Sequence, residues 1–181
     1  MRYREATRDD AQAIAAIHTD SWRNTYSDAL SAEFLAGPIL KDRLDVWEQR
    51  LSVPAPNQHV VVAEDGADIV GFACSYGCAD EHRGTLLDNL HVIRGKQGEG
   101  IGRRLLAGVA EWCTAAYPDS GLYLSVLEGN IRAQRFYGRL GAADVGGAVW
   151  DPPGGGNTRV RWYAWTKAQL AGMIADLASE A

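Results

Sequence analysis

The chain has 181 residues, of which 46% are hydrophobic and 23% charged, a composition typical of one soluble globular domain and not of a disordered or fibrous protein. The net charge is −5 and the 18 lysines and arginines are scattered, which argues against a nucleic-acid partner. No apolar run reaches the roughly 20 residues of a membrane span, so no membrane partner is expected. The first residues lack the apolar stretch of a secretory signal, and three cysteines are too few for a disulfide framework, so we expect a cytoplasmic protein.

The first half of the chain is expected to alternate strands and helices. Residues 2–5 predict a short strand, and Thr7 followed by Asp10 is typical of a helix cap. The helix after it carries Ile14 and Ile17 on one side. Further elements predicted in this half are a helical segment at 40–51, ended by Pro54, and a hairpin of strands 60–64 and 69–74 around Asp65-Gly66.

The second half predicts two strand–helix units. A strand at 86–92 runs into a glycine-rich segment at 95–102, and apolar residues then recur every three to four positions from Ile101 to Trp112, as in an amphipathic helix. The remaining predicted elements are a strand at 122–126, a helix from Asn130 to Gly141, strands at 143–149 and 160–165, and a helical tail at 167–179.

The glycine-rich segment is the strongest chemical signal. Positions without side chains let backbone amides approach a phosphate closely, and the N-terminus of the following helix adds partial positive charge. Two nucleotide motifs fail on spacing. Counted from Gly98, the sixth position of a dinucleotide fingerprint is Arg103, and neither Gly100 nor Gly102 is followed by the Lys-Ser/Thr of a P-loop.

The spacing that remains is Gln97-x-x-Gly100-x-Gly102, preceded by Leu90-His91-Val92. Here the sequence resembles the GNAT superfamily of acetyl-CoA-dependent N-acyltransferases, whose pyrophosphate loop reads Gln/Arg-x-x-Gly-x-Gly/Ala. A second signature of that family is an Asn followed by Ala and Tyr on the next helix. It is matched by Asn130, Ala133 and Tyr137. The resemblance covers about residues 1–165 and is most specific over 86–141.

The resemblance implies a single N-acetyltransferase domain over residues 1–181, with its motif core at 86–141 and a C-terminal helix at about 167–179. The implied fold class is α/β (α+β): a mixed, mostly antiparallel sheet of six or seven strands flanked by helices, with two splayed parallel central strands. The gap between those strands would admit the pantetheine arm, because an extended amide chain can pair with a free strand edge.

The resemblance also implies a set of residues that bind acetyl-CoA as cosubstrate. Leu90, His91 and Val92 would contact the pantetheine and the thioester. The pyrophosphate would lie against the loop formed by Gln97, Gly98, Glu99, Gly100, Ile101, Gly102 and Arg103. Asn130, Ala133 and Tyr137 would border the other side of the cofactor.

Catalysis needs a group that takes the proton of the amine, and Asp88 is our candidate. Many family members carry a glutamate early in this strand. That glutamate is absent here, and Asp88 is the nearest carboxylate. Glu81, His82, His91, a water relay and an amine already partly neutral in an apolar pocket remain alternatives. Tyr137 is the candidate acid for the departing thiolate, and the Val92 N–H the candidate donor to the oxyanion.

The expected reaction is direct attack of a small-molecule primary amine on acetyl-CoA, with Trp22, Tyr26 and Trp47 as walls of the acceptor site. A peptide or protein amine is the alternative acceptor, and a non-catalytic acyl-CoA sensor the alternative class of protein. Cys74, Cys78 and His82 recur every four residues, but with no fourth ligand evident we predict no metal site. Nothing in the sequence determines the oligomeric state, and a homodimer is left open.

Overall fold

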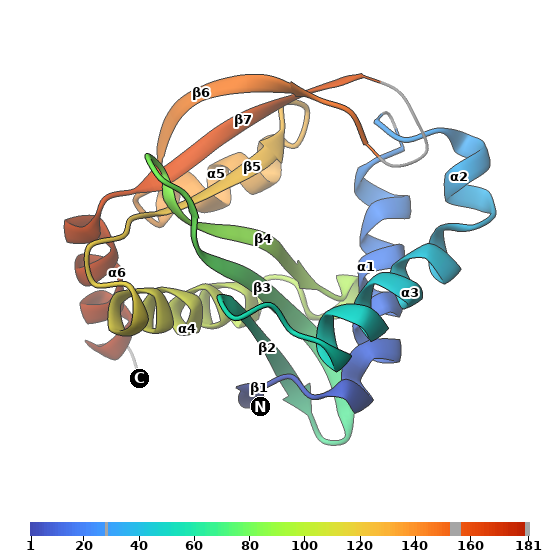
Figure 1. Cartoon of the computed structure of the whole chain (residues 1–181), viewed down its shortest axis with the longest axis horizontal. Helices are drawn as coiled ribbons and strands as arrows, with labels where there is room; N and C mark the ends of the chain where they lie inside the picture. Colours follow the sequence, from blue (N-terminus) through green and yellow to red (C-terminus); the bar gives the residue numbers. More distant parts are fainter. Residues whose placement is uncertain (28, 153–156, 180–181) are drawn as a thin grey trace.

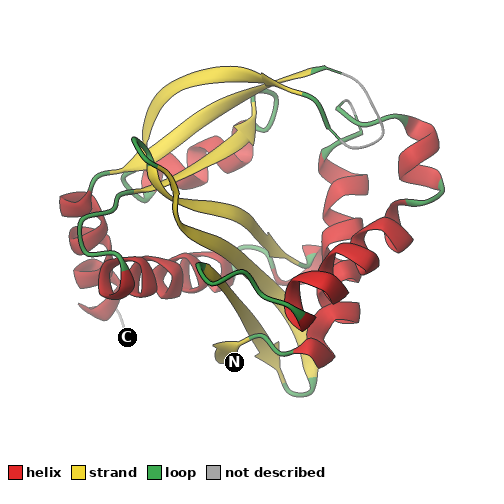
Figure 2. Cartoon of the chain, viewed as in Figure 1, coloured by secondary structure: helices red, strands yellow, loops and turns green. Residues whose placement is uncertain are grey.

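The computed structural model of the chain describes residues 1–27, 29–152 and 157–179. In these residues a seven-stranded sheet has the order β1-β2-β3-β4-β5-β7-β6, with helices packed on it (Figures 1 and 2). The strands are β1 (Arg2–Glu5), β2 (Gln58–Asp65), β3 (Asp68–Asp80), β4 (Gly84–Val92), β5 (Leu122–Leu127), β6 (Ala143–Trp150) and β7 (Thr158–Trp165). The helices are α1 (Ala11–Thr25), α2 (Ala32–Ala36), α3 (Ile39–Ser52), α4 (Ile101–Ala116), α5 (Ile131–Arg139) and α6 (Lys167–Ser179), with 3-10 turns η1 (Arg8–Asp10) and η2 (Arg94–Lys96).

The sheet divides between β4 and β5. These two strands are parallel, whereas the other neighbouring pairs are antiparallel. They pair only at Thr85 with Leu122 and at Leu86 with Tyr123, and then diverge toward their carboxyl ends (Figure 1). The predicted fold class, a mostly antiparallel sheet with two splayed parallel strands, is therefore confirmed.

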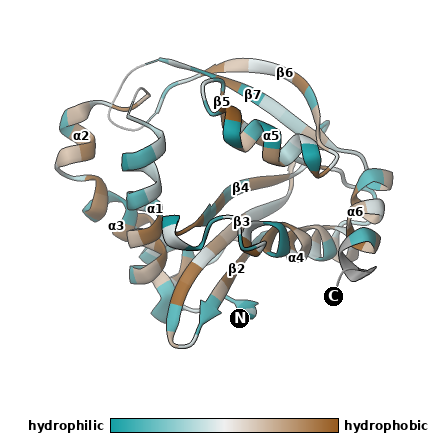
Figure 3. Cartoon of the chain, turned by 180° about the vertical axis from the view of Figure 1, so that it is seen from behind, coloured by the Kyte–Doolittle hydropathy of each residue, from teal (hydrophilic) through white to brown (hydrophobic). Residues whose placement is uncertain are grey.

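Alternation along the strands feeds two cores, one on each face of the sheet. In β2, Val61 packs with α4, whereas Val60 and Val62 pack with α1 and α3. Apolar residues accordingly run along β2 and β4 between the helices (Figure 3, brown). Burying a large aliphatic side chain contributes about 2 kcal/mol, so these two cores hold the divided sheet in place.

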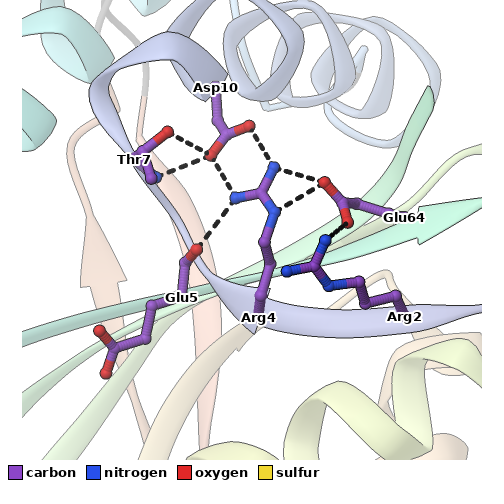
Figure 4. A network of polar contacts seen from close by, with 6 residues as sticks. All are labelled: Arg2, Arg4, Glu5, Thr7, Asp10 and Glu64. Atoms are coloured by element: carbon purple, nitrogen blue, oxygen red, sulfur yellow. Dashed lines mark hydrogen bonds and ion pairs between the residues drawn. The ribbon is translucent and has the colours of Figure 1, made fainter. Parts of the chain in front are cut away.

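A charged network fastens the N-terminal strand to the start of α1 and to β2 (Figure 4). The Arg4 guanidinium donates to the two carboxylate oxygens of Asp10 at 2.7 and 2.8 Å and to Glu64 Oε1 at 2.6 Å. Asp10 also accepts from the Thr7 backbone N–H at 2.7 Å, which is the capping interaction predicted from sequence. Hydrogen bonds from Arg4 lower the pKa of the Asp10 carboxyl.

Two features differ from the sequence prediction. The five-residue helix α2, capped by the Ser31 side chain, was not predicted, because so short an element carries no periodic signal. Strand β3 runs past the predicted end at 74 to Asp80, with its register to β4 irregular between Tyr76 and Asp80 and Cys78 at φ 45°. No helix in the described ranges is both long and apolar enough to cross a membrane.

Candidate active site

A groove of about 730 Å³ lies where β4 and β5 diverge. Its walls come from the end of α1, from β4, from the loop before α4, from β5 and from α5. The lining residues are Ser21, Thr25, Tyr26, Leu87, Asp88, Asn89, Leu90, His91, Val92, Lys96, Gln97, Gly98, Gly100, Gly102, Arg103, Leu124, Ser125, Val126, Asn130, Arg132, Ala133, Phe136, Tyr137, Arg139 and Leu140.

The glycine-rich loop forms one end of the groove. Gly98 and Gly100 have φ of +92° and +82°, a left-handed backbone conformation that residues other than glycine rarely adopt. Gly100 is the N-cap of α4, so the positive end of that helix begins at the groove. Of the predicted loop residues, two do not line the groove: the Glu99 carboxylate lies 3.6 Å from Lys96 Nζ, and Ile101 is buried in the core.

The edge of β4 that faces the groove has no strand partner beyond Leu86 in the described residues. The Ile93 N–H donates to Val70 O on β3 at 3.0 Å. Because backbone groups alternate along a strand, the N–H groups of Val92 and Leu90 point to the opposite edge, toward the groove. This unpaired edge is the place where an extended ligand can pair with the strand.

Helix α5 forms the opposite wall. Asn130 is its N-cap, with Oδ1 accepting from the Ala133 N–H at 3.1 Å, and it also lines the groove. Tyr137 lines the groove and is otherwise buried, with its ring near Phe136 and Trp165. Burial, together with the nearby Tyr26, raises the pKa of the Tyr137 phenol, so it holds its proton at neutral pH.

Asp88 lies at a β-bulge. Opposite β3, Cys74 pairs with Asn89 and the adjacent Ser75 pairs with Leu87, which leaves Asp88 as the extra residue of β4. Its carboxylate accepts from Arg50 Nη1 at 2.8 Å, and Asp88 lines the groove. A carboxylate therefore stands beside the gap where the two strands separate.

His91 is the other candidate base on the groove wall. Its Nδ1 lies 2.8 Å from Ser21 Oγ, and its ring stacks on His18 with centroids 4.9 Å apart. Burial lowers the pKa of His91 to about 4, so the imidazole is neutral at neutral pH. Glu81 and His82 lie elsewhere, in the turn between β3 and β4, and do not line this groove.

The structure adds groove residues from α1 that the sequence prediction missed, Ser21 and Thr25. Ser21 and Thr25 follow His18 by three and seven residues, so the three side chains lie on the same face of α1. Of the three aromatic residues predicted as walls of the acceptor site, Tyr26 lines the groove, whereas Trp22 is buried and does not. Trp47 does not either: that prediction is wrong, because Trp47 is fully buried under α1 and its Nε1 donates to His18 Nδ1 at 3.1 Å.

Comparison with known proteins identifies the class of protein to which this fold and groove belong. Residues 11–142 match the acetyltransferase (GNAT) family. A Bacillus subtilis (strain 168) protein named uncharacterized N-acetyltransferase YuaI is 32% identical over 130 residues, which cover 70% of this chain and 72% of that protein. The spermine/spermidine N(1)-acetyltransferase of the same strain is 35% identical over 80 residues, which cover 41% of this chain and 52% of that enzyme.

Solved structures show the same fold. The yncA structure from Salmonella typhimurium, determined with its cofactor acetyl-CoA, matches with a TM-score of 0.66 at 18% identity, covering 92% of this chain and 94% of that one. The chain belongs to the GNAT acetyltransferase family, which confirms the resemblance found in its sequence and the prediction that it is an acyltransferase.

Proposed function

We propose that the protein transfers the acetyl group of acetyl-CoA to a primary amine of a small molecule by direct attack. One observation carries this proposal: the gap between β4 and β5 has a left-handed glycine loop at one end and candidate proton acceptors and donors on its walls. A ligand with a pyrophosphate and an extended amide arm matches both parts of that groove.

Acetyl-CoA would bind through backbone groups. The amides of the loop from Gln97 to Gly102 would hold the pyrophosphate, and the free edge of β4 at Leu90 and Val92 would pair with the pantetheine arm. Asn130, Ala133 and Tyr137 would cover it from α5. His91 and Arg103 line the same groove and would add side-chain contacts. The reaction as proposed uses no metal ion.

In the proposed chemistry, the amine nitrogen attacks the thioester carbon, a C–N bond forms and the C–S bond breaks. Asp88 takes the proton that the amine gives up, directly or through a water molecule. The Val92 N–H donates to the oxyanion that develops. Tyr137, whose pKa is raised by burial, gives its proton to the departing sulfur.

The burial and protonation of the cysteines favour direct attack over a mechanism in which a cysteine first takes the acetyl group. Cys74 is fully buried, and burial raises its pKa to about 12. Burial also raises the pKa of Cys113, which lies on α4 and faces the core. Neither of these thiols, nor Cys78, lines the groove. A nucleophilic cysteine needs the thiolate form and access to the thioester.

A small-molecule acceptor is supported by the spermine/spermidine relative, and the site has a carboxylate, Asp88, that would attract a cationic amine. The test is release of CoA thiol from acetyl-CoA in the presence of spermidine, small monoamines, a peptide with a free N-terminus and an N-terminally blocked lysine peptide. We expect turnover with small amines. Turnover with the peptides alone would assign a peptide acceptor, and CoA binding without turnover would assign a sensor. A cytoplasmic location stays a prediction from the sequence.

A further inference from the structure

We propose that Arg50, at the end of α3, is a positioning residue that clamps the bulge of β4 and holds the Asp88 carboxylate toward the groove. The inference rests on the proposed function and adds to it a residue from outside the sequence motifs. It starts from one contact. Arg50 Nη1 donates to Asp88 Oδ2 at 2.8 Å and to Asn89 Oδ1 at 3.2 Å, so one nitrogen joins the two residues at the bulge.

The bulge makes a clamp necessary. The extra residue of a bulge is left unpaired, so the strand ladder does not hold it as it holds its neighbours. Asp88 is in that position, because Cys74 and Ser75 on β3 pair with the residues on either side of it. A second contact from another element therefore determines where its carboxylate lies. Arg50 provides that contact from α3.

Arg50 is itself held in place. Its guanidinium lies over the Trp47 ring at 5.1 Å and over the Tyr76 ring at 5.6 Å, between α3 and β3. Its backbone carbonyl accepts from Gln58 Nε2 at 2.9 Å, which fastens the end of α3 to β2. Trp47 is fully buried and donates to His18. The clamp is thus built on a packed support and does not have to be ordered when substrate binds.

The charges around Asp88 also favour this role. Five titratable groups interact electrostatically with the Asp88 carboxylate. They are Tyr26 just after α1, Cys74 and Tyr76 from β3, Tyr123 from β5 and Arg50 from α3. Burial raises the pKa of the tyrosines and of the thiol, so these four groups are neutral at neutral pH. Burial, the largest single cause, lowers the pKa of Arg50, but the charge of Asp88, the groups Cys74 and Tyr76 and the hydrogen bond to Asp88 together outweigh it, so the pKa is raised. Among these groups Arg50 supplies the positive charge.

The test compares Arg50→Met and Arg50→Lys with Lys41→Met. Lys41 is the matched control: it also lies on α3 and pairs with an aspartate, Asp45, but it is exposed and does not line the groove. Because misplacing a reacting group by about 1 Å can cost 10²-fold, we expect Arg50→Met to lower kcat by about 10- to 100-fold with little change in the KM for acetyl-CoA. Arg50→Lys should recover part of the loss, and Lys41→Met should behave as wild type.

Two further measurements separate this proposal from the proposed function. If Arg50 acts through Asp88, the double variant Arg50→Met/Asp88→Asn will be no slower than Asp88→Asn alone; additive losses would overturn the inference. Amide hydrogen exchange at Asn89, the residue of the bulge that pairs with Cys74, needs no turnover and should be faster in Arg50→Met and unchanged in Lys41→Met. Unchanged exchange in Arg50→Met would overturn the clamp even if the enzyme is active. Faster exchange in a protein that acetylates no amine would support the clamp and reject the proposed function.

Discussion

Gln97 Nε2 donates a hydrogen bond of 3.0 Å to the carbonyl oxygen of Val92. The contact joins the glycine-rich loop to the end of β4. The two parts of the groove that would hold the pyrophosphate and the thioester are therefore one unit. A change in the conformation of the loop should therefore shift the end of β4, and either change should alter the affinity for CoA.

Gly100→Ala should weaken CoA binding. Gly100 has φ +82°, and a residue with a Cβ pays about 1–2 kcal/mol in this left-handed region. The loop is expected to relax away from the conformation that binds phosphate, at a cost of about tenfold in affinity. Calorimetric titration of CoA measures this. Gly95→Ala is the control, because Gly95 lies in the same segment with open space around it and no positive φ. Equal affinity of the two variants for CoA would show that the loop does not bind the cofactor.

Asp88→Asn should lower the rate at neutral pH and abolish the acidic limb of the pH–rate profile. The amide keeps the size of the side chain but cannot take a proton. The comparison is the profile of kcat/KM for wild type and variant over pH 4–9. A limb that survives in the variant would exclude Asp88 as the base. A surviving limb near the pKa of about 4 of His91 would point to that residue.

Tyr137→Phe should lower kcat by about 10²-fold and leave the KM for acetyl-CoA nearly unchanged. The substitution removes the phenol oxygen and keeps the ring, which packs with Phe136 and Trp165. The factor is at the low end for general acid catalysis because a thiolate, from a thiol of pKa about 8.5, is a tolerable leaving group. Single-turnover kinetics give the rate of the chemical step. A wild-type rate in the variant would return Tyr137 to a packing role.

The Arg4–Asp10 pair should make stability depend on pH in the acid range. Hydrogen bonds from Arg4 lower the pKa of Asp10 in the folded state. The stabilisation is therefore complete above the unfolded value of about 3.9 and is lost as pH falls through the lower, folded value.

Asp10→Asn should cost about 2 kcal/mol at pH 7 and flatten this loss of stability in acid. Urea unfolding at several pH values between 2 and 7 measures the effect. Arg2→Met is the control, since Arg2 is exposed and lies 3.6 Å from Glu64. An equal effect of the two variants would mean that the network carries no special stability.

Local patterns in the sequence predicted most of the fold. The apolar run before Asp65-Gly66 predicted β2 and alternation predicted β5. Helical spacing predicted α4, and Thr7 with Asp10 predicted the cap before α1. The contacts of the groove depend on long-range packing, which a single sequence does not contain. Arg50 and Asp88 are far apart in the chain, and their contact exists only because α3 packs beside β4. In the same way, Trp47 was predicted as a wall of the acceptor site and lies instead in the core, because α1 covers it.

The transfer of the acetyl group itself is the most direct test of the proposed function. Protein in excess is mixed with acetyl-CoA that carries a radiolabelled acetyl group and with a panel of small primary amines, and the label is followed in amine, CoA ester and protein fractions. The proposed mechanism predicts that label moves to an amine as CoA thiol is released in equal amount, with no label left on the protein. Label retained on the protein, or no transfer to any amine while CoA still binds, would contradict it.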